Sequence, residues 1–254
     1  MRASLASVSV LALGLMLGGP ALAQQAGPAP TVAPAQIERI DRETIKDRLG
    51  KAGVEDREEF KGRLVQAQSP EGHPVLMLFG PENMAGDESV DFDRDEIRGR
   101  LAAQGFSNIT FADDAQMVRG SFGDDKRVLA FAGGLAMIAG VAQADQPDLD
   151  RMKSKLGEVG LEDRDEFRGK LIQARIDGQP VFLVIGPEDF AGDESVELSA
   201  ADLTKFQQEG FEDARVVDDV KIVRGTLDDK AVLALAGSGV RAEPAATGAV
   251  GVRQ

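Results

Sequence analysis

The sequence contains no cysteine, no tryptophan and no tyrosine, and it has one histidine among 254 residues. Without cysteine the chain has no disulfide, no thiolate nucleophile and no zinc site with cysteine ligands. A Ser-His-Asp triad would have to use His73, which lies in the turn-rich stretch 69–74 with no evident partner to orient its ring. No phosphate-binding loop and no dinucleotide-binding fingerprint occurs. We therefore predict no catalytic residues, no cofactor and no enzymatic activity.

Positive charge is scarce as well. The chain has 29 Lys and Arg against 43 Asp and Glu, and its net charge is −14. Such a chain repels phosphate backbones and anionic lipids, so we expect binding neither to nucleic acids nor to membrane surfaces. Its only aromatic residues are twelve phenylalanines. They add apolar area without a polar group, which predicts that their rings belong to the core.

The N-terminus has the parts of a secretory signal peptide. A basic start precedes an apolar stretch over 8–18, and a small-x-small pattern ends at Ala23. We expect cleavage after Ala23, so that residues 1–23 are a signal peptide and the mature protein is periplasmic or secreted. No cysteine follows the cleavage site, which argues against a lipid anchor. Residues 24–40 are rich in Ala, Pro and Gln and are expected to form a disordered linker.

One sequence unit occurs four times, with copies about fifty residues apart. Each copy starts with a candidate helix N-cap and continues with a helix that ends at a glycine flanked by apolar residues. A short strand follows, and then a hairpin whose last strand is apolar. Copies one and three match best, as do two and four, so the chain reads as a doubled pair. The N-caps are Asp41, Asp93, Asp148 and Ser199, and the glycines are Gly53, Gly105, Gly160 and Gly210.

These repeats divide the mature chain into two homologous halves of the size of small domains. The first pair of units is expected over 41–133 and the second over 148–237, joined by an apolar linker over 134–147. A disordered tail is expected over 238–254. The individual units span 41–80, 91–133, 148–186 and 197–237.

The uncharged apolar run 128–144 has two interpretations. In the first it is the closing strand of the second unit, followed by an Ala/Gly linker. In the second its end resembles a signal-peptide cleavage site, and the run is a relic of two fused secreted proteins or a second processing site. It is shorter than the roughly 20 residues that a membrane-spanning helix needs. We therefore expect no membrane span once the signal peptide is removed.

A helix followed by a hairpin predicts an α+β fold, with the helices of each pair packed on one face of an antiparallel sheet. The closing strands are unbroken apolar runs, typical of strands that are covered on both faces. Because the helices cover one face, the sheet of the other half or another chain has to cover the second, which leaves a homodimer open. In the second unit Leu129 and Phe131 alternate with Ala130 and Ala132. That alternation predicts two faces that pack differently.

The second unit combines a helix, a glycine and an aromatic residue over 96–106 with a hairpin over 116–129. In this it resembles PepSY-type domains, which are small secreted α+β modules of peptidase propeptides and cell-envelope proteins. The fourth unit is similar, and the first and third are more loosely so. None of the four has the Val-Asp-x-x-Thr-Gly turn with which that family often ends. The resemblance implies a binding protein that modulates a peptidase or another envelope process, and it implies no catalytic residues.

Two connecting loops, 80–90 and 186–196, are nearly identical although the strands before them differ. Loops usually vary more than cores, so their likeness indicates a shared role, although recent duplication or a solvated loop that merely positions a helix also explains it. We predict that they form an acidic contact edge with apolar anchors for a positively charged protein partner. The candidate interaction residues are Met84, Asp87, Glu88, Phe190, Asp193 and Glu194.

The alternative function is binding of a divalent cation, calcium above all, by the four acids Asp87, Glu88, Asp193 and Glu194. Two adjacent acids in each loop are few for a calcium ion, which takes about six to eight oxygens. The acids of 91–96 are spaced like the start of a calcium loop, but the loop's glycine and closing glutamate are missing, so helix capping explains them better. Paired aspartates elsewhere are expected in turns. They occupy 113–114, 124–125, 218–219 and 228–229.

Overall fold

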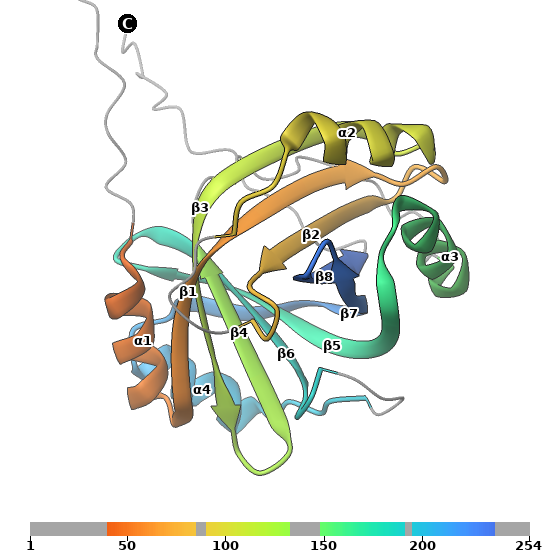
Figure 1. The fold of residues 1–254 in the computed structure, drawn as a ribbon. Coiled ribbons are helices and arrows are strands. Elements are labelled where there is room, and N and C mark those ends of the chain that lie inside the picture. The colour runs from red at the N-terminus through yellow and green to blue at the C-terminus, as the bar shows by residue number, and fades with distance from the viewer. Residues whose placement is uncertain (1–39, 85–89, 133–147, 191–194, 237–254) are drawn as a thin grey trace, which may run out of the picture. The chain divides into compact units, whose positions relative to one another are not determined.

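The computed structural model describes residues 40–84, 90–132, 148–190 and 195–236. Within them a helix, a long strand and a short strand follow one another four times (Figure 1). The helices are α1 (Arg42–Lys51), α2 (Arg94–Ala103), α3 (Leu149–Val159) and α4 (Ala200–Gln208). The long strands are β1 (Val54–Gln68), β3 (Ser107–Phe122), β5 (Glu162–Ile176) and β7 (Glu212–Leu227). The short strands are β2 (Pro74–Gly80), β4 (Lys126–Ala132), β6 (Gln179–Pro187) and β8 (Lys230–Ala236).

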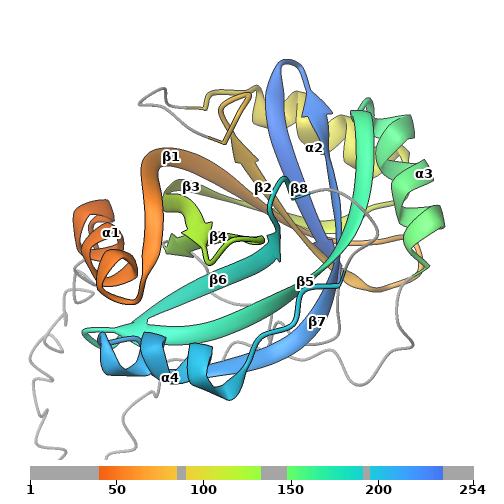
Figure 2. The same cartoon turned by 90° about the horizontal axis from the view of Figure 1, so that it is seen from below.

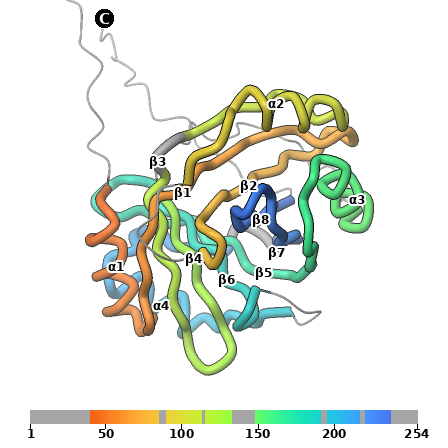
Figure 3. Tube along the Cα trace, viewed as in Figure 1, coloured from red at the N-terminus to blue at the C-terminus, as the bar shows by residue number. Residues whose placement is uncertain are grey.

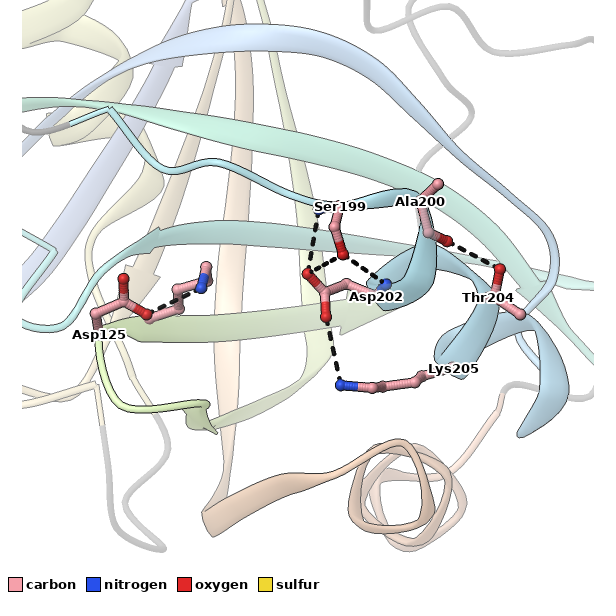
Figure 4. A network of polar contacts seen from close by, with 7 residues as sticks. Asp125, Ser199, Ala200, Asp202, Thr204 and Lys205 are labelled. Atoms are coloured by element: carbon pink, nitrogen blue, oxygen red, sulfur yellow. Dashed lines mark hydrogen bonds and ion pairs between the residues drawn. The ribbon is translucent and has the colours of Figure 1, made fainter.

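All four helices begin at the predicted N-cap residues. Each cap side chain accepts a hydrogen bond from a backbone N–H of the first turn, which satisfies a donor that has no partner inside the helix. At α4 the cap is reciprocal: the Ser199 hydroxyl accepts from the backbone N–H of Asp202, and the Asp202 carboxylate accepts from that of Ser199 (Figure 4). The capping interpretation of the acids over 91–96 is confirmed, because Asp93 accepts from the N–H groups of Asp95 and Glu96.

The predicted helix ends are confirmed as well. The four glycines have φ values of +88°, +85°, +109° and +87° in chain order, a left-handed backbone that glycine adopts without steric cost. At the last three, the next residue donates its N–H to the carbonyl five residues back, and this bond closes the helix. The apolar residue after Gly210 packs as expected, since the rings of Phe206 and Phe211 meet edge to face with centroids 5.5 Å apart.

The prediction of open sheets, each with helices on one face, is wrong. All eight strands form one closed antiparallel barrel in the order β1-β2-β8-β7-β5-β6-β4-β3. The long strands pair within each half (β1 with β3, β5 with β7), and the short strands pair between halves (β2 with β8, β4 with β6). Exchanging the two halves leaves this cyclic order unchanged, so the barrel has the pseudo-two-fold symmetry of its doubled sequence.

The long strands bend where the sequence suggested a turn. Residues 113–114 and 218–219 were expected in turns, yet they lie within β3 and β7, beside register irregularities in the pairings with β1 and β5. A bulge of this kind bends a strand without reversing the chain, and Figure 3 shows the curvature of these strands. The acids of 124–125 and 228–229 do lie at hairpin turns. The charged residues 55–59 belong to β1.

Alternation along the short strands divides the core into an interior and two outer clusters. Leu129 and Phe131 of β4 point into the barrel, where Phe131 stacks on Phe182 of β6 with centroids 5.5 Å apart. Ala130 and Ala132 point outward, beneath α1 and α4. The expectation that these strands are covered on both faces and pack differently on each is therefore confirmed. The barrel interior, to which both halves contribute, covers the second face.

The helices lie outside the barrel in two pairs, each with one helix from each half. Side chains of α1 and α4 share one outer cluster, and those of α2 and α3 share the other. Figures 1 and 2 show the two pairs on different sides of the barrel. Polar contacts also join the halves, for example from Arg48 of α1 to the carbonyl oxygen of Glu209 at 3.3 Å. Both helix pairs therefore bridge the two halves of the chain.

Residues 128–132 of the apolar run belong to β4, as the first of its two interpretations expects. The remainder of the run, the signal peptide, the linkers and the tail lie outside the described residues.

A candidate binding site at one end of the barrel

The two nearly identical loops begin at the same end of the barrel. Their described parts, 80–84 and 186–190, begin at the ends of β2 and β6, which belong to different halves of the chain. Residues of both loops line one cavity of about 100 Å³ at this end. We call this end, with residues 83–84 and 188–190, the barrel mouth. The fold thus brings together the two stretches that the sequence singled out.

Met84 and Phe190 close the barrel at the mouth. Their exposed fractions are 5% and 6%, and both belong to the interior cluster. Each ends a tight turn in which its N–H bonds to a proline carbonyl, Pro81 at 2.7 Å and Pro187 at 2.9 Å. Their φ values of +51° and +50° are unusual for residues with a side chain, so the surrounding contacts hold the backbone in a strained conformation.

An arginine from the barrel wall holds each turn. Arg119 of β3 and Arg224 of β7 each lie two residues after a side chain of the interior cluster. Because side chains alternate between the two faces of a strand, both arginines point inward, at the mouth. Arg119 donates to the carbonyl oxygen of Asn83 and Arg224 to that of Asp189, in each case at 2.6 Å. The bonded carbonyl lies one residue before Met84 or Phe190. In both halves, therefore, a hydrogen bond from a strand arginine to a backbone carbonyl holds the loop in place.

A third arginine breaks the symmetry of the mouth. Arg127 of β4 donates through Nε to the carbonyl oxygen of Glu188 at 2.8 Å and through Nη1 to the hydroxyl of Ser121. In the matching hairpin of the second half, Ala231 occupies this position. Arg119, Arg127 and Arg224 all line the same cavity. An acidic chain has therefore gathered three guanidinium groups at one point.

A larger hollow of about 510 Å³ lies on the outer surface beside the start of α3. Its lining includes acidic side chains, among them Asp150 and Glu166, and the basic side chains of Arg168 and Lys221. The Glu166 carboxylate is 3.8 Å from the Lys153 ammonium group. The hollow brings no histidine to its only lining hydroxyl, that of Ser195, so its described residues form no triad.

The predicted site residues fall into two groups. Met84 and Phe190 lie at the mouth with their side chains covered, so a partner reaches them only if the loops open. Asp87, Glu88, Asp193 and Glu194 lie outside the described residues. His73 is half-buried in the β1–β2 turn, where its N–H bonds to the Ser69 hydroxyl at 3.2 Å. The part of the chain that the structure describes contains no group of three or more His, Cys, Asp or Glu able to hold a metal ion.

No protein-family model, no curated protein and no solved structure matches this chain. The resemblance to PepSY-type domains therefore stays a prediction. Over the described ranges, no helix is both long and apolar enough to cross a membrane.

Sequence reasoning found the two loops but missed the three arginines beside them. Arg119 and Arg224 occupy the same position in the second and fourth units, each directly before a glycine and after a strand-like run. Strand alternation from Met117 or Ile222 predicts an inward-facing charge at these positions. An inward-facing arginine indicates a strand end at which the interior meets solvent, and that signal was available in the sequence.

Proposed function

We propose that this chain is a non-enzymatic periplasmic or secreted protein that binds another protein through the barrel mouth and the two loops beginning there. The observation that supports this proposal is that the described parts of the two loops, 80–84 and 186–190, lie at one end of the barrel. Two loops that start at one end can serve a single contact surface, whereas loops that start at opposite ends would need two.

The rest of the described structure favours binding at a surface over binding inside the barrel. Apolar side chains from all eight strands fill the interior, and several of the largest are less than 2% exposed. Among the described residues, Val216 is the only large apolar side chain that is exposed. A partner is therefore recognised mainly by charge. With a net charge of −14, the protein attracts a cationic surface most strongly.

The test is a variant in which the loop acids are replaced together. It carries Asp87→Ala, Glu88→Ala, Asp193→Ala and Glu194→Ala. Wild type and variant are compared in pull-downs from envelope extract of the cell that makes the protein, and in thermal unfolding. We expect the variant to lose its partners at an unchanged melting temperature, because these acids would contact the partner and not the barrel.

A matched control removes four acids elsewhere. These acids are exposed and form no ion pair within the described ranges, and the changes are Glu43→Ala, Asp47→Ala, Glu162→Ala and Glu212→Ala. The control has the same net charge as the loop variant and should keep its partners. If the loop variant keeps its partners, or if the control loses them equally, the contact edge is excluded.

The same four loop acids support the second candidate function, binding of a divalent cation. Because the described parts of both loops lie at one end of the barrel, a cation site there could draw oxygens from two loops and not from one. If this is the function, calcium raises the melting temperature of wild type and leaves that of the loop variant unchanged. Equal behaviour of the two proteins in calcium excludes it.

A further inference from the structure

From the three arginines at the mouth we propose that the cavity they line binds a phosphoryl group, either free phosphate or a phosphate monoester. The proposal does not depend on a protein partner. It rests on the unused donors of the guanidinium groups, on the size of the cavity and on the position of the site at the axis that relates the two halves.

The guanidinium groups have N–H donors that are not bonded to an acceptor among the described residues. Arg119 uses Nη1 for Asn83 and Nη2 for the Glu58 carboxylate at 2.9 Å, while its Nε–H is buried and has no partner among the described residues. Arg224 donates one hydrogen bond within the described ranges, to the Asp189 carbonyl. A buried N–H group without an acceptor destabilises the fold, so an acceptor that reaches Nε of Arg119 relieves this cost.

The backbone bonds of these arginines prepare the site for a ligand. Three carbonyl oxygens, from Asn83, Glu188 and Asp189, hold the guanidinium groups in place without neutralising them, because a carbonyl carries no net charge. Among the described residues, Glu58 is the only carboxylate bonded to any of the three. Glu188 and Asp189 also line the cavity, but their side chains are exposed and form no ion pair with the arginines in the described structure. The guanidinium groups therefore keep N–H donors that an anion in the cavity can use.

The size of the cavity and the number of its N–H donors select the class of ligand. A cavity of about 100 Å³ has room for a phosphoryl group. The two oxygens of a planar carboxylate are used up by two N–H groups of a single arginine. The oxygens of a phosphoryl group point in several directions and can accept hydrogen bonds from several arginines around it. Three arginines from β3, β4 and β7 thus match a phosphoryl group better than a carboxylate.

The position of the site agrees with this geometry. Arg119 and Arg224 come from corresponding strands of the two halves, so the cavity between them lies on the pseudo-two-fold axis. A tetrahedral oxyanion has two-fold axes of its own and can present equivalent oxygens to both arginines. Arg127 adds a third contact on one side only.

The test measures thermal unfolding of the intact protein in inorganic phosphate, in O-phosphoserine, and in acetate and chloride at equal ionic strength. We expect phosphate to raise the melting temperature of wild type, and acetate and chloride to have little effect. Arg127→Ala copies the alanine of the matching hairpin, and Arg224→Gln removes the charge on the opposite side. Each variant should weaken phosphate binding by about tenfold or more, because it loses a charge-assisted hydrogen bond.

The control is Arg215→Ala, an exposed arginine of β7 that does not line the cavity. It should keep the wild-type response to phosphate. A phosphate response equal to that of O-phosphoserine indicates a site open to monoesters, and a response to free phosphate alone indicates an enclosed site. The proposal is overturned if phosphate has no effect, if chloride or acetate has the same effect, or if both mouth variants respond as wild type does.

Discussion

At the scale of single residues, the left-handed glycine after each helix allows the helix to end and the chain to turn toward the next strand. Gly105 has a φ of +85°, and a Cβ added there would lie 3.2 Å from Pro70 of the β1–β2 turn. We expect Gly105→Val to destabilise the protein by about 2 kcal/mol or more, because an L-residue in this conformation costs roughly 1–2 kcal/mol and a β-branched one costs more. Denaturant unfolding of purified protein measures the loss.

Gly105→Asn is the matched control, since asparagine tolerates a left-handed backbone better than other residues with a side chain. It should lose clearly less stability than the valine variant. Equal losses would mean that contact with Pro70, and not the backbone conformation, sets the cost. These glycines were predictable from the sequence because a helix end is a local event: the cap, the glycine and the apolar residue after it lie within one short stretch.

At the scale of an element, the reciprocal cap of α4 links stability to pH. Burial alone would raise the pKa of Asp202, but hydrogen bonds from Ser199 and the contact with Lys205 outweigh it and hold the pKa below its ordinary value of 3.8. A carboxylate with a lowered pKa stabilises the fold above its unfolded value, and that stabilisation is lost as the pH falls through the folded value. We expect Asp202→Ala to cost stability at neutral pH and progressively less below pH 3.8.

Urea unfolding of wild type and Asp202→Ala at a series of pH values measures this difference. Ser199→Ala, which removes the other half of the cap, should cost about 1 kcal/mol at neutral pH. Asp124→Ala, which removes an exposed carboxyl from the β3–β4 turn, controls for the loss of one negative charge. A difference between wild type and Asp202→Ala that stays constant with pH would contradict the linkage.

The strands were less predictable than the helices at this scale. Residues 113–114 and 218–219 carry adjacent aspartates, which are frequent in turns, yet here the strand continues past them through a register irregularity. A bulge and a turn use similar residues, and only pairing with β1 or β5 distinguishes them. In the same way the charged residues after Val54 are compatible with a strand because an outward-facing position lies in solvent.

At the scale of the whole molecule, neither half completes the barrel alone. The first half has the strand order β2-β1-β3-β4, and both of its edges are apolar strands that pair with the other half in the intact chain. Unpaired edges of this kind associate readily. We expect residues 41–133, produced alone, to form a homodimer in which β2 of one copy pairs with β4 of the other, as measured by analytical ultracentrifugation.

Adding residues 148–237 should convert this homodimer into a one-to-one complex with the circular dichroism of the intact chain. A folded monomer of either half would contradict the expectation. Barrel closure could not be predicted from the sequence, because it depends on pairs such as Leu78 with Leu233, which no local pattern connects. The sequence did indicate that a second layer was needed, and the sheet of the other half supplies it.

The one-sided arginine of the mouth has a consequence for the history of the chain. In a barrel assembled from two identical copies, every substitution at the axis appears twice, and an arginine at position 127 would face its own duplicate. A fused chain is free of this constraint, and here one half carries Arg127 while the other carries Ala231. Joining the halves in one gene therefore permits a polarised mouth, in which an anion has one preferred orientation.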